Sequence, residues 1–241
     1  MSTLRFGAKP ITAVRLGAKP VSRIMLGRTT VWNAVQVYDD FNRPDAELDD
    51  DGSWVNHGPS LDHVASVVDN RCRIGIPDNF TAGVFERISY MRYAKATSPT
   101  EDGYVEALVA TMGDSTKTLL GDINYQTHVY GRVSNTGFNA GVGIWLAASE
   151  IGLIVRQGLK ETVVARFGAY SPGNIVRLEW KGKLYTMFRD GVSLGTWNDS
   201  TNMVATGTGN RSLGLRVHGA KEKLGLGPRR FSAALDYVEY G

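Results

Sequence analysis

Alternation of apolar and polar residues with a period of two recurs along most of this chain, and it restricts the fold more than any other feature. Beyond Tyr38 a dozen segments of strand length show it, separated by turn residues such as SPGN, RDG and NDSTN. The segments are HVASVV, RCRIGI, GVFERISYMRY, GYVEALVATM, HVYGRV, VGIWLA, IGLIVRQ, ETVVARF, NIVRLEWKG, LYTMFRDG, RSLGLRVHG and RFSAALDYVEY. None keeps a helical period over three turns. The sequence therefore predicts an all-β protein built as a two-sheet β-sandwich.

The first 32 residues follow a different pattern, a repeat of ten residues. GAKP stands at 7–10 and again at 17–20, and a third glycine follows at Gly27. In each unit two apolar residues spaced by two precede the glycine, which is typical of a very short strand that ends in a turn. Pro10 and Pro20 suit a turn or an edge strand. We expect residues 1–34 to form a β-repeat segment and residues 35–241 to form one domain.

The repeat is predicted to be an attachment or oligomerisation segment. A ribbon of two or three strands is only marginally stable alone in water, and repeat units gain stability by stacking on neighbours. The predicted assembly interface consists of the apolar residues of the repeat: Leu4, Phe6, Val14, Leu16, Ile24, Leu26 and Trp32. The alternative is that the segment folds back on the main domain as ordinary edge strands.

Charge is divided unevenly along the chain. The net charge is +3, but residues 1–32 hold six lysines and arginines and no acid, which leaves −3 for the rest. Because these cations alternate with apolar residues, they fit the wet side of strands, and we expect no nucleic-acid partner. No run of about 20 apolar residues and no signal-peptide core occurs, so we expect no membrane insertion and folding in a cytosol. Cys72 is the single cysteine and excludes an internal disulfide.

Two stretches resemble concanavalin A-like (laminin-G-like) jelly-roll domains. DDFNRPDAELDDDGSWVNHG, residues 39–58, has the D-x-F-x-R start and the later tryptophan of many such domains. NIVRLEWKGKLYTMFRDGVSLGTW, residues 174–197, resembles their late run of hairpin-connected strands, and RSLGLRVHG and FSAALDYVEY resemble the last two strands. The resemblance covers about residues 38–241 and implies a jelly-roll β-sandwich.

The opening repeat carries a second resemblance. Short units that end in LG, closed by a V-W pair, are similar to the starts of minor tail proteins of siphophages that infect actinobacteria. With a lectin-like jelly roll behind it, the chain resembles such a phage minor tail protein. The resemblance implies a homotrimeric virion component, made in the host cytoplasm, at or near the tail tip, with other tail proteins as partners and host surface glycans as contacts. A free carbohydrate-binding module and a glycoside hydrolase are the alternatives.

Acidic residues do not form a hydrolase pattern. Glycoside hydrolysis needs two carboxylates that flank the scissile bond, and the hydrolases of this fold supply them as E-x-D-x-E or E-x-D-x-x-E on one strand. Here Glu179 stands alone, and the spacing of three places Asp236 and Glu239 on opposite faces of a strand. Cys72 has no base nearby and is expected to be a small buried side chain. We therefore predict no catalytic residue and no enzyme.

A metal site is also not predicted. Glu47, Asp49, Asp51 and Gly52 match the first half of a calcium loop, but the twelfth position holds Gly58 in place of the usual glutamate. A solvated acidic loop is the favoured explanation. The four histidines lack zinc-ligand spacing. No cofactor is expected.

Sugar binding remains the plausible chemistry. A saccharide site needs an aromatic surface and a few polar groups for the hydroxyls. Trp145 and Trp197 are the predicted platforms, with Asn198 and Asp199 beside the second. The alternative is that a tryptophan within an alternating strand, such as Trp145, belongs to the core.

Overall fold

The structure is a computed structural model that describes residues 5–6, 9–10, 14–16, 19–21, 23–26, 29–33, 37–59, 62–77, 86–118, 121–221 and 227–241. Side chains are defined from Val37 onward. The described residues form strands, turns and loops without a helix, which confirms the predicted all-β class. No helix that could cross a membrane occurs in this part of the chain.

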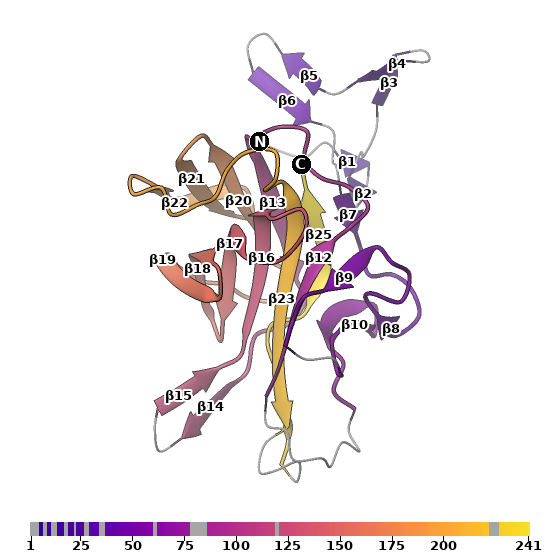
Figure 1. The fold of residues 1–241 in the computed structure, drawn as a ribbon, viewed down its shortest axis with the longest axis vertical. Coiled ribbons are helices and arrows are strands. Elements are labelled where there is room, and N and C mark those ends of the chain that lie inside the picture. Colours follow the sequence, from indigo (N-terminus) through magenta and orange to yellow (C-terminus); the bar gives the residue numbers. More distant parts are fainter. Residues whose placement is uncertain are drawn as a thin grey trace.

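Two antiparallel sheets lie face to face and make a β-sandwich (Figure 1). The nine-stranded sheet has the order β22-β21-β20-β13-β25-β11-β10-β8, with β7 also paired to β25. Its strands are β7 (Val37–Asp39), β8 (Ala46–Glu47), β10 (Ala65–Val68), β11 (Arg71–Ile74), β13 (Gly103–Val109), β20 (Ile175–Lys181), β21 (Leu184–Arg189), β22 (Val192–Asn198) and β25 (Leu235–Tyr240).

The eight-stranded sheet has the order β19-β18-β17-β16-β23-β12-β9, with β24 also paired to β23. Its strands are β9 (Trp54–Asn56), β12 (Glu86–Tyr93), β16 (Gln126–Val133), β17 (Ala140–Ala147), β18 (Glu150–Gln157), β19 (Lys160–Ala169), β23 (Ser212–Lys221) and β24 (Arg229–Phe231). A separate polar hairpin joins β14 (Ser115–Thr118) to β15 (Gly121–Asn124).

The core lies between the sheets and follows from the alternation in the sequence. Every second residue of a strand points to the same face, so residues such as Val129 and Ile144 of one sheet meet Val105 and Leu178 of the other. All four side chains are fully buried. Cys72 lies in the same core, where burial raises the pKa of its thiol, and it is inert there, as the sequence indicates.

The opening repeat forms three β-hairpins. β1 (Arg5–Phe6) pairs with β2 (Lys9–Pro10), β3 (Val14–Leu16) with β4 (Lys19–Val21), and β5 (Arg23–Leu26) with β6 (Thr29–Asn33). Each pair is a two-stranded sheet of its own, and none extends a sheet of the sandwich among the described residues. Figure 1 shows β3–β4 and β5–β6 beyond one end of the sandwich.

The last predicted segment, RFSAALDYVEY, is not one strand. Its first part, β24, pairs with β23 in the eight-stranded sheet, whereas β25 pairs with β13 in the other sheet. The chain crosses between the sheets at Ser232–Ala234, where small side chains leave room for the backbone. Ser232 Oγ accepts a hydrogen bond from Thr127 Oγ1 (2.7 Å) and one from the His218 amide (3.1 Å). The amide of His218 thus has a hydrogen-bond acceptor at the point where the chain crosses.

Candidate functional site

The D-x-F-x-R motif and its later tryptophan form one buried hydrogen-bonded unit centred on Asp39. The two carboxylate oxygens of Asp39 accept hydrogen bonds from both terminal nitrogens of Arg43, at 2.6 and 3.2 Å. They also accept the amide of Phe41 (3.0 Å) and the indole Nε1–H of Trp54 (2.9 Å). Both Phe41 and Trp54 are buried in the core. The motif therefore holds the start of the sandwich against its core. These four hydrogen bonds engage both oxygens of the Asp39 carboxylate.

The outer face of the eight-stranded sheet, which points away from the other sheet, carries aromatic rings. These rings belong to a second, smaller cluster: Tyr90, Tyr130, Phe138 and Trp145. Glycines make room for them, because a Cβ on Gly214 would lie 2.6 Å from the Phe138 ring and one on Gly152 would lie 2.9 Å from the Trp145 ring. Strands β17 and β23 are consequently buried along their whole length.

Arginines lie over these rings. The guanidinium carbon of Arg156 is 4.3 Å from the centre of the Tyr90 ring and 5.4 Å from that of Phe138. Arg166 covers Trp145 in the same way, at 4.8 Å. These cation–π contacts fill the outer face with side chains of the chain itself.

Glu161 of β19 is the centre of a polar network on this face. Its Oε1 accepts hydrogen bonds from Tyr130 (2.8 Å) and Arg156 (3.0 Å), and its Oε2 lies 3.5 Å from Arg216 Nε. Burial alone would raise the pKa of the Glu161 carboxyl, but His128, Arg216 and the Tyr130 hydroxyl together hold it well below its usual range. Glu161 is therefore an ionised carboxylate that neutralises buried arginines.

His128 extends the network and is held neutral. Its Nδ1 is 2.9 Å from the Tyr130 hydroxyl, which itself donates to Glu161. Its Nε2 lies 3.2 Å from Gln126 Oε1 and 3.4 Å from Arg216 Nη1. Burial and the charge of Arg216 lower the pKa of His128 to about 4.

His218 lies further along the same face and is also neutral. Its ring is 4.8 Å from that of Tyr125, and neither ring nitrogen has a hydrogen-bond partner among the described residues. Burial, with the charge of Arg216, lowers the pKa of His218 to about 3. Between the ordinary histidine pKa of about 6.5 and these lowered values, the unfolded chain binds protons that the folded chain does not bind. The stability that the neutral histidines contribute is therefore fully present above about pH 6.5 and is lost as the pH falls below it.

Replacement of His218 by phenylalanine is therefore expected to reduce acid lability. Phenylalanine keeps a ring against Tyr125 and cannot ionise. Between about pH 7 and pH 5 the original chain should lose about 2 kcal/mol more free energy of unfolding than H218F, because one histidine contributes about 1.4 kcal/mol per pH unit below 6.5. Urea unfolding at the two pH values measures this difference. Equal losses in both chains would contradict the role given to His218.

The two tryptophans among the four predicted sugar-binding residues lie on different sheets. Trp145 is in β17, 4% exposed, beneath Arg166 on the outer face. Trp197 is half-buried in β22, where its ring packs on Tyr185 at 5.4 Å and against the inter-sheet core. Asn198 is exposed, whereas Asp199 is buried and accepts the amides of Met203 and Val204 at 2.8 and 2.9 Å. The two tryptophans thus lie in separate clusters, and sugar binding by this set stays a prediction.

The acids considered for hydrolysis are engaged elsewhere. Glu179 lies 2.8 Å from Arg177, and Asp236 lies 3.2 Å from Arg71 on the surface. Glu239 is fully buried and accepts the Tyr104 hydroxyl at 2.6 Å.

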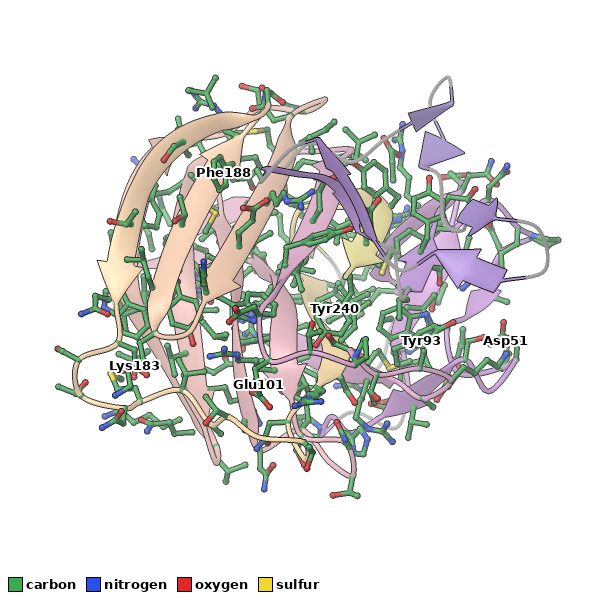
Figure 2. All side chains as sticks on the ribbon, turned by 90° about the horizontal axis from the view of Figure 1, so that it is seen from above. Asp51, Tyr93, Glu101, Lys183, Phe188 and Tyr240 are labelled. Carbon is green, nitrogen blue, oxygen red and sulfur yellow. The ribbon has the colours of Figure 1, made fainter. Side chains whose placement is uncertain are left out.

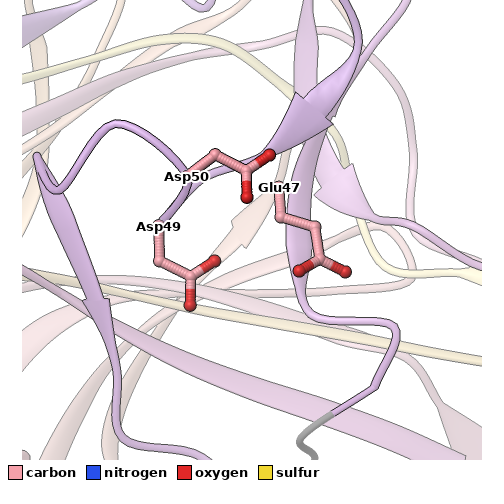
Figure 3. A group of neighbouring side chains, drawn as sticks. All are labelled: Glu47, Asp49 and Asp50. Carbon is pink, nitrogen blue, oxygen red and sulfur yellow. The ribbon is translucent and has the colours of Figure 1, made fainter.

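The acidic loop gathers three carboxylates, but not the three expected from the calcium-loop pattern. Glu47, Asp49 and Asp50 place one oxygen each within 4.8 Å of one another (Figure 3). Asp51 turns away and accepts the amide of Ser53 at 2.7 Å. Burial, together with repulsion by Asp49 and Asp50, raises the pKa of Glu47. Glu47 and Asp50 are exposed and Asp49 is half-buried, and like charges at this spacing repel one another.

The predicted assembly interface falls on residues whose side chains the structure does not define. Leu4 lies outside the described residues. The other six, Phe6, Val14, Leu16, Ile24, Leu26 and Trp32, are placed by their backbone in the first strands of the three hairpins and in β6. The interface therefore stays a prediction.

Comparison with known proteins identifies the fold. No protein-family model and no curated protein matches the sequence. Among solved structures, an endo-β-1,3-glucanase from Pyrococcus furiosus is similar with a TM-score of 0.52 and 8% identity, over 95% of this chain and 97% of that one. An endo-1,3-β-glucanase from Streptomyces sioyaensis gives a TM-score of 0.52 and 12% identity, over 85% and 95%. At such identities the likeness concerns the fold alone. The chain is a concanavalin A-like jelly-roll β-sandwich.

Proposed function

We propose that the chain is a structural component of a virion, a phage minor tail protein at or near the tail tip. In this proposal the hairpin repeat joins the protein to itself as a trimer and to other tail proteins. The jelly roll is displayed outward, where it touches glycans of the host surface. A free carbohydrate-binding module is the alternative function.

The hairpin repeat is the observation that carries the proposal. Each hairpin forms a two-stranded sheet of its own, and none pairs with a strand of the sandwich among the described residues. An isolated two-stranded hairpin is marginally stable in water, so three in succession need a further surface to pack on. A neighbouring copy or another tail protein would supply that surface, in keeping with the resemblance of the repeat to the starts of minor tail proteins.

The outer face supports a role without catalysis. A glycosidase needs a general acid with a raised pKa and a second carboxylate that flanks the same bond. Glu161 has a lowered pKa and contacts two arginines. Two further acids on this face, Glu86 and Glu150, lie beside His218 and Arg166 respectively. Turnover of a cell-wall polysaccharide would contradict this part of the proposal.

Removal of residues 1–36 tests the proposal. We expect the chain of residues 37–241 to unfold cooperatively like the full chain but to be monomeric, because the sandwich keeps its core and loses the hairpins. Light scattering compares the two chains, and labelling of virions compares their incorporation. The full chain with Leu16→Asp and Leu26→Asp is the matched control and should behave like the truncated chain. A monomeric full chain, or a truncated chain that still joins virions, would contradict the proposal.

A further inference from the structure

A row of charged and aromatic side chains crosses the nine-stranded sheet on its outer face, which points away from the eight-stranded sheet. Five adjacent strands give one residue each, and each residue is the register partner of the next. In order across β21, β20, β13, β25 and β7, this glutamate row consists of Phe188, Arg177, Glu106, Glu239 and Tyr38. Each has a sequence neighbour in the core, so strand alternation turns the row outward. Figure 2 labels Phe188 at one end of the row and Tyr240, the neighbour of Glu239 in the chain.

The middle of the glutamate row is buried, although it faces away from the core. Glu239 is fully buried, Glu106 is 5% exposed and Arg177 is 7% exposed, whereas Tyr38 and Phe188 at the ends are half-buried. Glutamate and arginine are rarely buried to this degree, and on the outward face of a sheet such burial requires a cover. Because a single chain buries these side chains, the cover belongs to this chain.

Hydrogen bonds hold the two glutamates of the row in place. Glu106 accepts the Tyr237 hydroxyl at 2.7 Å and Arg177 Nη1 at 3.2 Å. Glu239 accepts the Tyr104 hydroxyl at 2.6 Å. The guanidinium carbon of Arg177 is 3.6 Å from the centre of the Tyr104 ring. The two tyrosines are 5% exposed each, so they report on whatever lies over this face.

The centre of this face is negative. Among the described residues it carries three carboxylates, of Glu106, Glu179 and Glu239, and the guanidinium of Arg177, which lies 3.2 Å from Glu106 and 2.8 Å from Glu179. Glu106 and Glu239 are also direct register partners, and like charges opposite each other in a sheet repel. A segment with positive charge is therefore the favoured cover.

The opening segment fits this requirement in charge and in position. Residues 1–32 hold six lysines and arginines and no acid. The segment enters the sandwich at β7, which pairs with β25 and carries Tyr38 of the row. Figure 1 shows β1 and β2 at the end of the sandwich where β7 lies, and β14–β15 at the opposite end. The eight-stranded sheet packs on the other face, so the three hairpins are the described strands that remain.

We infer that the opening segment folds back on its own chain and covers the glutamate row through its first hairpin, β1–β2. The connection at β7 keeps the segment beside this face at a high effective concentration, which favours the same chain over a neighbouring copy. The second and third hairpins, β3–β4 and β5–β6, stay available for the assembly contact proposed above. The inference does not depend on that contact.

Tyrosine nitration of the full chain, mapped by peptide mass spectrometry, tests this inference. We expect Tyr104 and Tyr237 to be protected in the original chain. Arg5→Glu with Lys9→Glu reverses the charge of the first hairpin, and repulsion from the row should make both tyrosines react at least about tenfold faster. Arg15→Glu with Lys19→Glu makes the same change at the equivalent positions of the second unit of the repeat. This matched control should leave both tyrosines protected.

A milder variant, Arg5→Gln with Lys9→Gln, removes the charges without reversing them and should give a smaller increase; it serves if the reversed chain does not fold. Tyrosines that stay protected in the first-hairpin variants, or that react equally in the second-hairpin control, would overturn the inference. Protection that is lost on dilution of the original chain would also overturn it, because the cover would then come from a neighbouring copy. Light scattering separates the two proposals: a monomeric full chain with the expected nitration pattern counts against assembly only.

Discussion

Replacing Glu161 with alanine is expected to lower the free energy of unfolding by about 3–5 kcal/mol. The substitution leaves Arg156 and Arg216 without their carboxylate, although their side chains are only 6% and 7% exposed. It also removes the acceptor of the Tyr130 hydroxyl, which is fully buried. Removal of one partner from a buried ion pair costs far more than the pair contributes, because the remaining charge stays desolvated. Urea unfolding at neutral pH measures the loss.

Two further variants separate charge from contact. Glu161→Gln keeps an oxygen for Tyr130 but removes the charge, so its loss should lie between those of E161A and the original chain. Glu150→Ala removes the partner of Arg166 in a largely exposed ion pair, and its cost should not exceed about 1 kcal/mol. If E161A costs no more than E150A, the outer-face network does not stabilise the fold as described.

The strands themselves could be predicted from the sequence, because alternation and turn residues are local signals. Each of the dozen predicted segments overlaps a strand, and HVASVV and ETVVARF are examples that fall within a residue or two of β10 and β19. The hairpin β14–β15 was missed, since STKT and GDIN are polar and carry no alternation. Local pattern also failed at Ser232–Ala234, where the change of sheet depends on tertiary contacts with Thr127 and His218.

The Glu161 network could not be predicted, because its members come from strands far apart in the sequence. Gln126–Val133, Ser212–Lys221 and Lys160–Ala169 meet only through the sheet order β19-β18-β17-β16-β23. The one local signal is a glycine in each of AGVGIWLA and SLGLRVHG. A Cβ on Gly141 would lie 3.1 Å from the Tyr130 ring, and one on Gly214 would lie 2.6 Å from the Phe138 ring. An alternating pattern also does not say that both faces of β17 and β23 are buried.

The resemblance of residues 39–58 to jelly-roll domains gains a physical reason from Asp39. D-x-F-x-R places an acid so that it binds its own backbone two residues on and an arginine four residues on, and the tryptophan closes the unit. Sequence reasoning could identify this motif, because its acid, its arginine and its tryptophan lie close together in the sequence.

Replacing Asp39 with alanine is expected to lower the free energy of unfolding by about 3 kcal/mol. The substitution leaves the indole N–H of Trp54 without an acceptor in the core, and Arg43 loses its bidentate partner. Asp39→Asn keeps one acceptor oxygen and should cost about half as much. Thermal and urea unfolding of the full chain measure both losses.

The matched control is Asp236→Ala, whose carboxylate pairs with Arg71 across an exposed surface, and we expect a loss of at most about 1 kcal/mol. Trp54→Phe provides a second arm, because it removes the N–H that Asp39 accepts while most of the buried ring remains. If the motif acts as one unit, the losses of D39A and W54F should not add in the double variant. Additive losses, or a D39A chain as stable as D236A, would mean that the motif does not close the sandwich through this carboxylate.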